Sequence, residues 1–102
     1  MKNYLLSLEA VEDIAEIRRY LSKTASRTIS RHVLSELRAA LRFLAENPGA
    51  GHWRRDLTVA SVKFWPVFSY LVIYDPAKRP LGITRVLHGS RNVETLLRNV
   101  RV

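Results

Sequence analysis

The stretch Val67-Phe68-Ser69-Tyr70-Leu71-Val72-Ile73-Tyr74 decides the fold of this chain. It is rich in β-branched and aromatic residues, which favour β-strands. From Phe68 to Tyr74, apolar residues occupy both alternations, as they do in a strand that is covered on both faces. We therefore predict that this stretch is the central strand of a sheet.

Further strands are predicted on either side of the central one. Val62-Lys63-Phe64 precedes it, with a break at Trp65-Pro66, and Leu81 to His88 follows it after a turn at residues 75–80. Short turns between successive strands give an antiparallel meander. We expect the segment from Gly49 to Asp56, before this meander, to be an irregular crossing.

The N-terminal half predicts a strand and two helices. Asn3 to Leu8 is short and apolar, and Ser7 can cap a helix that ends near Lys23. A longer helix runs from about Ser26 to Glu46 and stops at Asn47-Pro48-Gly49. Apolar residues at helical spacing mark the buried sides of the two helices: Ala10, Ile14, Ile17 and Leu21 in the first, and Val33, Leu37, Ala40, Leu41 and Leu44 in the second.

Residues 1–102 together predict a single α+β domain. Its N-terminal strand is followed by an antiparallel helical hairpin, because the connection Ser22–Ala25 is short. The hairpin packs on a mainly antiparallel sheet in the order β-α-α-β-β-β, which gives the helices a face to cover. Glu94 to Val100 adds a last short helix.

The charged residues of both helices have structural interpretations. Acidic residues near the start of the first helix and basic residues near its end suit the helix dipole: Glu9, Glu12, Asp13 and Glu16, then Arg18, Arg19 and Lys23. A stripe of Arg27, Arg31, Arg38 and Arg42 on the second helix is interpreted as its solvated face. His32 is expected to be a partly covered surface residue.

The charge of the chain is large and unevenly distributed. The formal net charge is +8, and residues 51–102 carry nine Lys and Arg against three acidic residues, which leaves +2 for residues 1–50. Such a C-terminal half should attract polyanions, either nucleic acid or an acidic protein segment. There is no cysteine, which excludes disulfides and thiolate metal sites, and the scattered histidines lack metal-ligand spacing. Neither a metal nor a cofactor is predicted.

No apolar run approaches the length of a membrane span, and the apolar stretch before Glu9 is too short for a signal peptide. We therefore expect a cytoplasmic protein without a membrane partner.

The segment Arg85-Val86-Leu87-His88-Gly89-Ser90-Arg91-Asn92 gathers basic and titratable groups where a strand breaks at Gly89. Such a position suits a binding or catalytic site. Strand alternation, however, sends the side chains of Arg85 and His88 to opposite faces. A histidine before glycine at a strand end is more often a hydrogen-bonding residue that fixes the turn than a catalyst.

Trp53 and Trp65 stand beside basic residues, namely Arg54, Arg55 and Lys63. Tryptophan in so small a domain normally belongs to the core, and this interpretation is favoured for Trp65. For Trp53, a core position and an exposed aromatic-basic surface for a partner are equally supported.

These pieces, in this order, resemble the ParE branch of the RelE/ParE toxin superfamily. The matching segments span nearly the whole chain: Leu6-Ser7-Leu8-Glu9-Ala10 with Asp13, Ile14 and Ile17, then Leu41, Leu44 and Asn47-Pro48-Gly49-Ala50-Gly51, then Arg55-Asp56-Leu57, Phe64-Trp65-Pro66-Val67, Tyr70-Leu71-Val72-Ile73-Tyr74, and Arg85 to Asn92. At the position of Asn92 the family often has an acidic residue.

The resemblance implies a toxin that a cognate, ParD-like antitoxin neutralises in a hetero-oligomeric complex. ParE-like toxins are associated with poisoning of DNA gyrase, which blocks replication, whereas RelE-like relatives cut messenger RNA on the ribosome. An inactive binding module on the same fold is a third alternative. For the gyrase alternative, the expected contact residues are basic or aromatic: Trp53, Arg54, Arg55, Lys63, Arg85, His88 and Arg91.

Metal-free RNA cleavage needs a base, an acid and cations for the developing charge. Lys63, Arg85, His88 and Arg91 are the candidates for these roles, and His88 is the natural proton carrier because its ordinary pKa is near neutrality. RelE-like nucleases commonly carry a further tyrosine or histidine in the last segment, which Glu94 to Val102 lacks. The sequence therefore favours a binding toxin over a nuclease.

Overall fold

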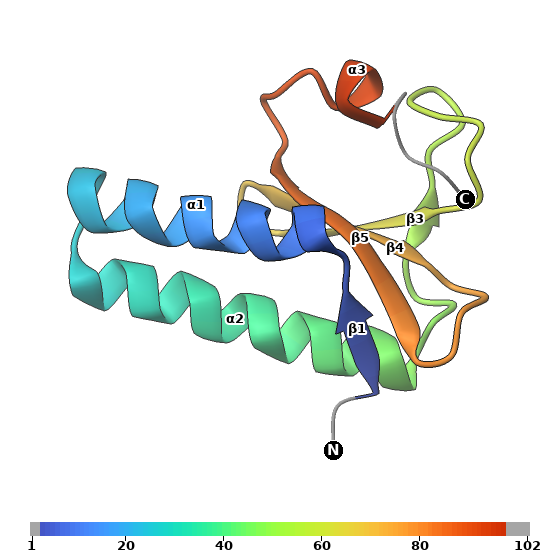
Figure 1. The fold of residues 1–102 in the computed structure, drawn as a ribbon, viewed down its shortest axis with the longest axis horizontal. Coiled ribbons are helices and arrows are strands. Elements are labelled where there is room, and N and C mark those ends of the chain that lie inside the picture. Colours follow the sequence, from blue (N-terminus) through green and yellow to red (C-terminus); the bar gives the residue numbers. More distant parts are fainter. Residues whose placement is uncertain (1–2, 98–102) are drawn as a thin grey trace.

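The computed structural model describes residues 3–97 (Figure 1). The elements along the chain are β1 (Tyr4–Leu6), α1 (Leu8–Thr24), α2 (Arg27–Glu46), β2 (His52–Trp53), β3 (Lys63–Val67), β4 (Tyr70–Asp75), β5 (Leu81–His88) and α3 (Val93–Leu97). They confirm the predicted α+β class and the predicted order of the main elements.

The strands form one five-stranded sheet in the order β1-β5-β4-β3-β2. β1 pairs with β5 in parallel, and the other neighbouring strands are antiparallel. β4 lies in the middle, with Val72, Ile73 and Tyr74 fully buried. This confirms that the stretch before Asp75 contains the central strand.

The helices α1 and α2 lie side by side and antiparallel, and they pack on one face of the sheet (Figure 1). Ser7 is the N-cap of α1, as predicted, because its hydroxyl oxygen accepts a hydrogen bond from the backbone N–H of Ala10 at 3.0 Å. The predicted apolar stripes of both helices, apart from the half-buried Ala40, belong to or pack against the first hydrophobic core, which also contains Val72, Ile83 and Val86 of the sheet.

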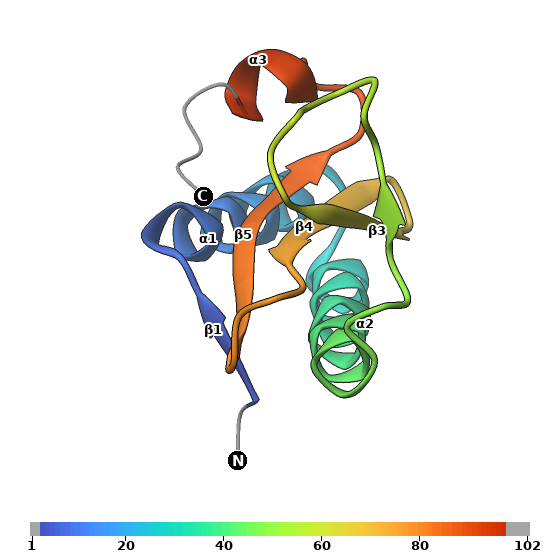
Figure 2. The same ribbon diagram turned by 90° about the vertical axis from the view of Figure 1, so that its right-hand side faces the viewer.

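A second hydrophobic core covers the other face of the sheet. Figure 2 shows α3 beside the loop that connects β2 to β3. This core consists of Val62, Phe64, Ile73, Leu87, Val93 and Leu97. α3 confirms a short helix within the predicted segment Glu94–Val100, whose last residues, 98–100, lie outside the described part of the chain.

The predicted break at Trp65-Pro66 is wrong, because β3 runs through both residues and the hairpin turns at Phe68 and Ser69 instead. Proline has no N–H to donate to a neighbouring strand. β2 pairs with Lys63 and Phe64, so the outer side of β3 at Pro66 lies beyond this pairing and proline is tolerated. Phe68 has φ 55°, in the left-handed region that bulky residues rarely adopt.

The expected irregular crossing between Gly49 and Asp56 contains the short strand β2, which the sequence did not reveal. The buried Tyr74 hydroxyl organises this segment: it donates to the carbonyl oxygen of Pro48 at 2.7 Å and accepts from the N–H of Gly51 at 2.9 Å. A Cβ atom on Gly51 would lie 2.5 Å from the Tyr74 oxygen, so a larger residue does not fit there without a shift.

Candidate partner-binding site

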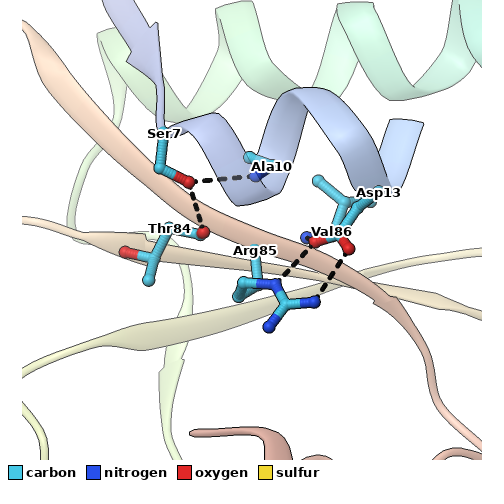
Figure 3. A network of polar contacts seen from close by, with 6 residues as sticks. All are labelled: Ser7, Ala10, Asp13, Thr84, Arg85 and Val86. Carbon is cyan, nitrogen blue, oxygen red and sulfur yellow. Dashed lines mark hydrogen bonds and ion pairs between the residues drawn. The ribbon is translucent and has the colours of Figure 1, made fainter. Parts of the chain in front are cut away.

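The predicted site residue Arg85 is held by Asp13 of α1 (Figure 3). Arg85 Nε donates to Asp13 Oδ2 at 2.8 Å and Arg85 Nη2 donates to Asp13 Oδ1 at 2.9 Å. The backbone N–H of Val86 donates to Asp13 Oδ2 at 3.0 Å. The pairing of β1 with β5 ends at Ile83, and the Asp13 carboxylate binds the next free stretch of the β5 edge.

The interpretation of Asp13 as a dipole residue is therefore incomplete. Its carboxylate is buried and takes part in tertiary contacts between α1 and β5. Ser7 adds a second link, because its hydroxyl donates to the carbonyl oxygen of Thr84 at 2.7 Å (Figure 3). A signal was present in the sequence: Asp13 lies between Ala10 and Ile17 on the apolar stripe, where an unpaired carboxylate would be costly.

Hydrogen bonding to Asp13 raises the pKa of Arg85 above its already high ordinary value, so the guanidinium remains charged. A bidentate, charge-assisted pair of this kind fixes the side chain. Arg85 lies opposite Ile73 of the second core, whereas His88 lies opposite Tyr70 of the first. Facing residues of an antiparallel pair point to the same side, so the predicted separation of Arg85 and His88 onto opposite faces is confirmed.

His88 fixes the turn that follows β5. Its Nδ1 atom accepts a hydrogen bond from the backbone N–H of Ser90 at 3.1 Å and lies 2.6 Å from the Ser90 hydroxyl oxygen. Because Nδ1 acts as an acceptor, we assign the proton of the neutral ring to Nε2. The ring stands edge-on to Tyr70, with 5.3 Å between the ring centroids. These contacts confirm the hydrogen-bonding interpretation of His88.

A pocket of about 300 Å³ lies between α1 and the end of β5, and we call it the strand-end pocket. Its lining residues are Asp13, Glu16, Ile17, Tyr20, Tyr70, Val86, Leu87, His88, Ser90 and Arg91. The structure thus brings Glu16 and two tyrosines to His88, although the sequence suggested no further proton carrier there. Helix α1 and strand β5 are far apart in the chain, so local patterns do not reveal this juxtaposition.

A second group of predicted residues lies at the β2 edge of the sheet, on β2, β3 and the loop between them. The Arg55 guanidinium carbon and Lys63 Nζ each lie 5.0 Å from the centroid of the Trp53 ring. The side chain of Trp53 is 46% exposed. We call these three residues the Trp53 cluster, and they support the partner-surface interpretation of Trp53 over the core interpretation.

The remaining predicted residues flank the Trp53 cluster. Arg54 is engaged by exposed Asp56 in a bidentate pair at 2.9 and 2.8 Å. That hydrogen bonding raises the pKa of Arg54 and lowers the pKa of Asp56. Trp65 is half-buried against the first core, as predicted, and its ring centroid lies 5.4 Å from that of Phe43.

Six of the seven sequence-predicted site residues thus fall into three groups, and the seventh, Arg54, is paired with Asp56. His88 and Arg91 share the strand-end pocket, and the Trp53 cluster occupies the β2 edge. The guanidinium of Arg85 forms an ion pair with Asp13 instead of facing a partner. Exposed aromatic rings with adjacent cations recognise acidic or aromatic groups of a partner, whereas the Arg85 pair stabilises the scaffold that carries both surfaces.

Comparison with known proteins agrees with this fold. Residues 4–93 match the family described as ParE toxin of type II toxin-antitoxin system, parDE. The chain therefore belongs to the ParE toxin family of type II toxin–antitoxin systems. No curated protein matches the sequence.

A solved structure described as the chromosomal ParDE TA system from P. aeruginosa is similar in fold, with a TM-score of 0.71 and 14% sequence identity. The match covers 86% of this chain and 96% of the other. At this identity the likeness concerns the fold, which it supports over most of both chains.

None of the helices within residues 3–97 is long and apolar enough to span a bilayer. In the same part of the chain, no group of three or more His, Asp or Glu side chains is arranged to hold a metal ion.

Proposed function

We propose that this toxin poisons DNA gyrase in the cytoplasm and that a cognate antitoxin neutralises it. The observation that carries the proposal is that Arg85 and His88, near the end of β5, are already engaged in hydrogen bonds within the protein. Arg85 is bound by Asp13, and the Nδ1 atom of His88 accepts the Ser90 N–H. With the proton on Nε2, His88 can donate a hydrogen bond toward a partner but is not arranged to remove a proton through that atom.

The Trp53 cluster supplies the contact surface in this proposal. A half-exposed indole with two cations close to its ring presents a large apolar area with positive charge beside it, and such residues dominate protein interfaces. The strand-end pocket contributes His88 and Arg91 as further contacts. The link to gyrase rests on the association of ParE-like toxins with this enzyme.

The test is to incubate the purified protein with gyrase, relaxed plasmid and ATP, denature the complex, and measure linear and supercoiled DNA. Linear DNA should accumulate with the wild-type protein and should be strongly reduced with Trp53→Ala. Arg19→Ala, an exposed cation on α1, is the matched control and should behave as the wild type. The proposal would be refuted if the folded wild-type protein produced no linear DNA and did not inhibit supercoiling.

One observation favours a second candidate function, a ribosome-dependent mRNA endonuclease. The strand-end pocket places Glu16, Tyr20 and Tyr70 around His88, which are groups able to exchange protons. The discriminating assay uses ribosomes programmed with messenger RNA. A discrete cut that persists in His32→Ala and disappears in His88→Ala would establish the nuclease and reverse our ranking. Expression without a growth defect would instead indicate an inactive binding module.

A further inference from the structure

Helix α2 carries four exposed arginines along one side, and we call Arg27, Arg31, Arg38 and Arg42 the arginine stripe. Successive members are four, seven and four residues apart, and these spacings keep their side chains on one side of an α-helix. At a rise of 1.5 Å per residue, the stripe extends over about 22 Å. Ser35, which is also exposed, lies on the same side between Arg31 and Arg38.

The arginine stripe has no carboxylate partner within residues 3–97. The ion pairs formed there join Arg54 to Asp56 and Arg85 to Asp13. All four residues of the stripe are exposed, so their guanidinium groups are open to a ligand. Each guanidinium carries five N–H donors and a permanent positive charge. The stripe therefore presents a row of cations that the described part of the chain does not neutralise by ion pairing.

The charges of α2 run against its helix dipole. Helix α1 has Glu9 in its first turn and Lys23 in its last turn, which is the favourable order. Helix α2 begins at Arg27, has no acidic residue in its first turn and no basic residue in its last turn, and ends at Glu46. Cations at the positive end of a helix disfavour folding. Interpretation of the stripe as a solvated face explains its exposure, but it does not explain this order of charges.

The arginines of the stripe also repel one another. Arg27 and Arg31 are four residues apart, as are Arg38 and Arg42, and like charges at this spacing destabilise a helix. A polyanion that lies along the stripe removes this repulsion at both pairs. The use of arginine at all four positions favours phosphate as the anion, because a guanidinium forms bidentate hydrogen bonds with phosphate oxygens.

We propose that the arginine stripe binds the backbone of duplex DNA, independently of base sequence. Duplex DNA is stiff and carries one negative charge per about 1.7 Å of its axis, so a straight row of cations contacts several phosphates at once. Serine hydroxyls also bind phosphates, and Ser35 lies within the row. The members of the stripe offer no apolar anchor, which an acidic polypeptide would need. This activity goes beyond the proposed contact with gyrase, which uses the Trp53 cluster.

The test measures binding of the purified full-length protein to a fluorescent duplex of about 20 base pairs by anisotropy, between about 50 and 200 mM NaCl. Four phosphate contacts contribute about −3.6 to the slope of log association constant against log salt, which is an affinity loss of about 150-fold over this range. Arg27→Gln/Arg31→Gln should make the slope less steep by about 1.8, and so should Arg38→Gln/Arg42→Gln. Arg19→Gln/Lys78→Gln removes two exposed charges outside the stripe and should leave the slope near the wild-type value.

Circular dichroism and thermal melting establish that the three double variants fold. Equal slopes for the stripe variants and the Arg19→Gln/Lys78→Gln control would overturn the proposal, because net charge rather than the stripe would then set the affinity. Tighter binding of poly-L-glutamate than of the duplex would also overturn it, since an acidic polypeptide would then be the better ligand. Binding to one of two duplexes of unrelated sequence, but not to the other, would contradict recognition of the backbone. Gyrase is absent from this experiment, so its result is independent of the gyrase assay.

Discussion

Asp13 of α1 and Arg85 of β5, which are 72 positions apart in the sequence, form a bidentate ion pair with most of both side chains shielded from water. The carboxylate also binds the backbone N–H of Val86, so one side chain fixes both the helix and the edge of the strand. This relationship makes Asp13 a structural residue within a site that was first inferred from its basic neighbours.

Replacing Asp13 by asparagine should lower the free energy of unfolding by about 3 kcal/mol, because Arg85 is left without its counter-ion in a largely buried position. Urea unfolding measures the change. Asp56→Asn, which disrupts the exposed pair with Arg54, serves as the control and should leave stability unaltered. Equal effects of the two substitutions would show that the Asp13 pair is not a structural link.

Removing the Tyr74 hydroxyl should destabilise the fold at neutral pH. Tyr74→Phe leaves the Gly51 N–H and the Pro48 carbonyl without their shared partner, a loss of about 1–3 kcal/mol. Thermal or urea unfolding at pH 7 measures it. Tyr20→Phe, at an exposed tyrosine, is the matched control and should unfold as the wild type does.

The same tyrosine predicts a pH dependence. Burial raises the pKa of Tyr74 above its ordinary value of 10.0, so folding favours the protonated phenol. Its contribution to stability is complete below pH 10.0 and is lost as the pH rises through the folded-state pKa. The unfolding free energy of the wild type should therefore fall above pH 10.0, and less steeply in Tyr74→Phe. Identical slopes for the two proteins would be inconsistent with this account.

Phe68→Gly should raise the free energy of unfolding by about 1 kcal/mol, because glycine adopts the left-handed conformation of Phe68 without steric cost. The Phe68 side chain is 61% exposed, so little burial is lost. Ser69→Gly, in the same turn, should give no such gain, since among residues 3–97 Phe68 is the non-glycine residue with positive φ. Destabilisation by Phe68→Gly would mean that its ring contact with His32 outweighs the strain.

The tautomer of His88 can be observed directly by ¹H–¹⁵N correlation of the imidazole ring. The wild-type protein should show the neutral ring protonated at Nε2, because Nδ1 accepts the Ser90 N–H. Ser90→Ala retains that amide and should preserve the tautomer, whereas Ser90→Pro removes the donor and should release it. A neutral ring protonated at Nδ1 in the wild-type protein would remove the main argument against His88 as a base.

The sequence predicted those parts of the fold that depend on local periodicity. The apolar stripes located α1 and α2, the capping Ser7 marked the start of α1, and the run that is apolar on both alternations located β4. The turn at Phe68 was missed because it lacks the glycine or asparagine that usually supplies a positive φ. β2 was missed because a strand of two residues is too short to show an alternation of apolar and polar side chains.

The candidate site was predicted in part for the same reason. Trp53 and Arg55 are close in sequence, and pairing of β2 with β3 brings Lys63 opposite Trp53. By contrast, the contacts of Asp13 with Arg85 and of Tyr70 with His88 depend on tertiary packing between segments that no local pattern connects. The charged residues at the end of β5 therefore suggested a site, but they did not show which side chains are engaged within the protein and which can contact a partner.

The parallel pairing of β1 with β5 also has a consequence for synthesis of the chain. Tyr4–Leu6 pairs with Leu81–Ile83, which are synthesised more than seventy residues later. The β1 edge of the sheet therefore cannot form until β5 has left the ribosome, since non-local pairings are completed late. A nascent chain that ends before β5 has both helices but lacks the strand that joins β1 to the rest of the sheet.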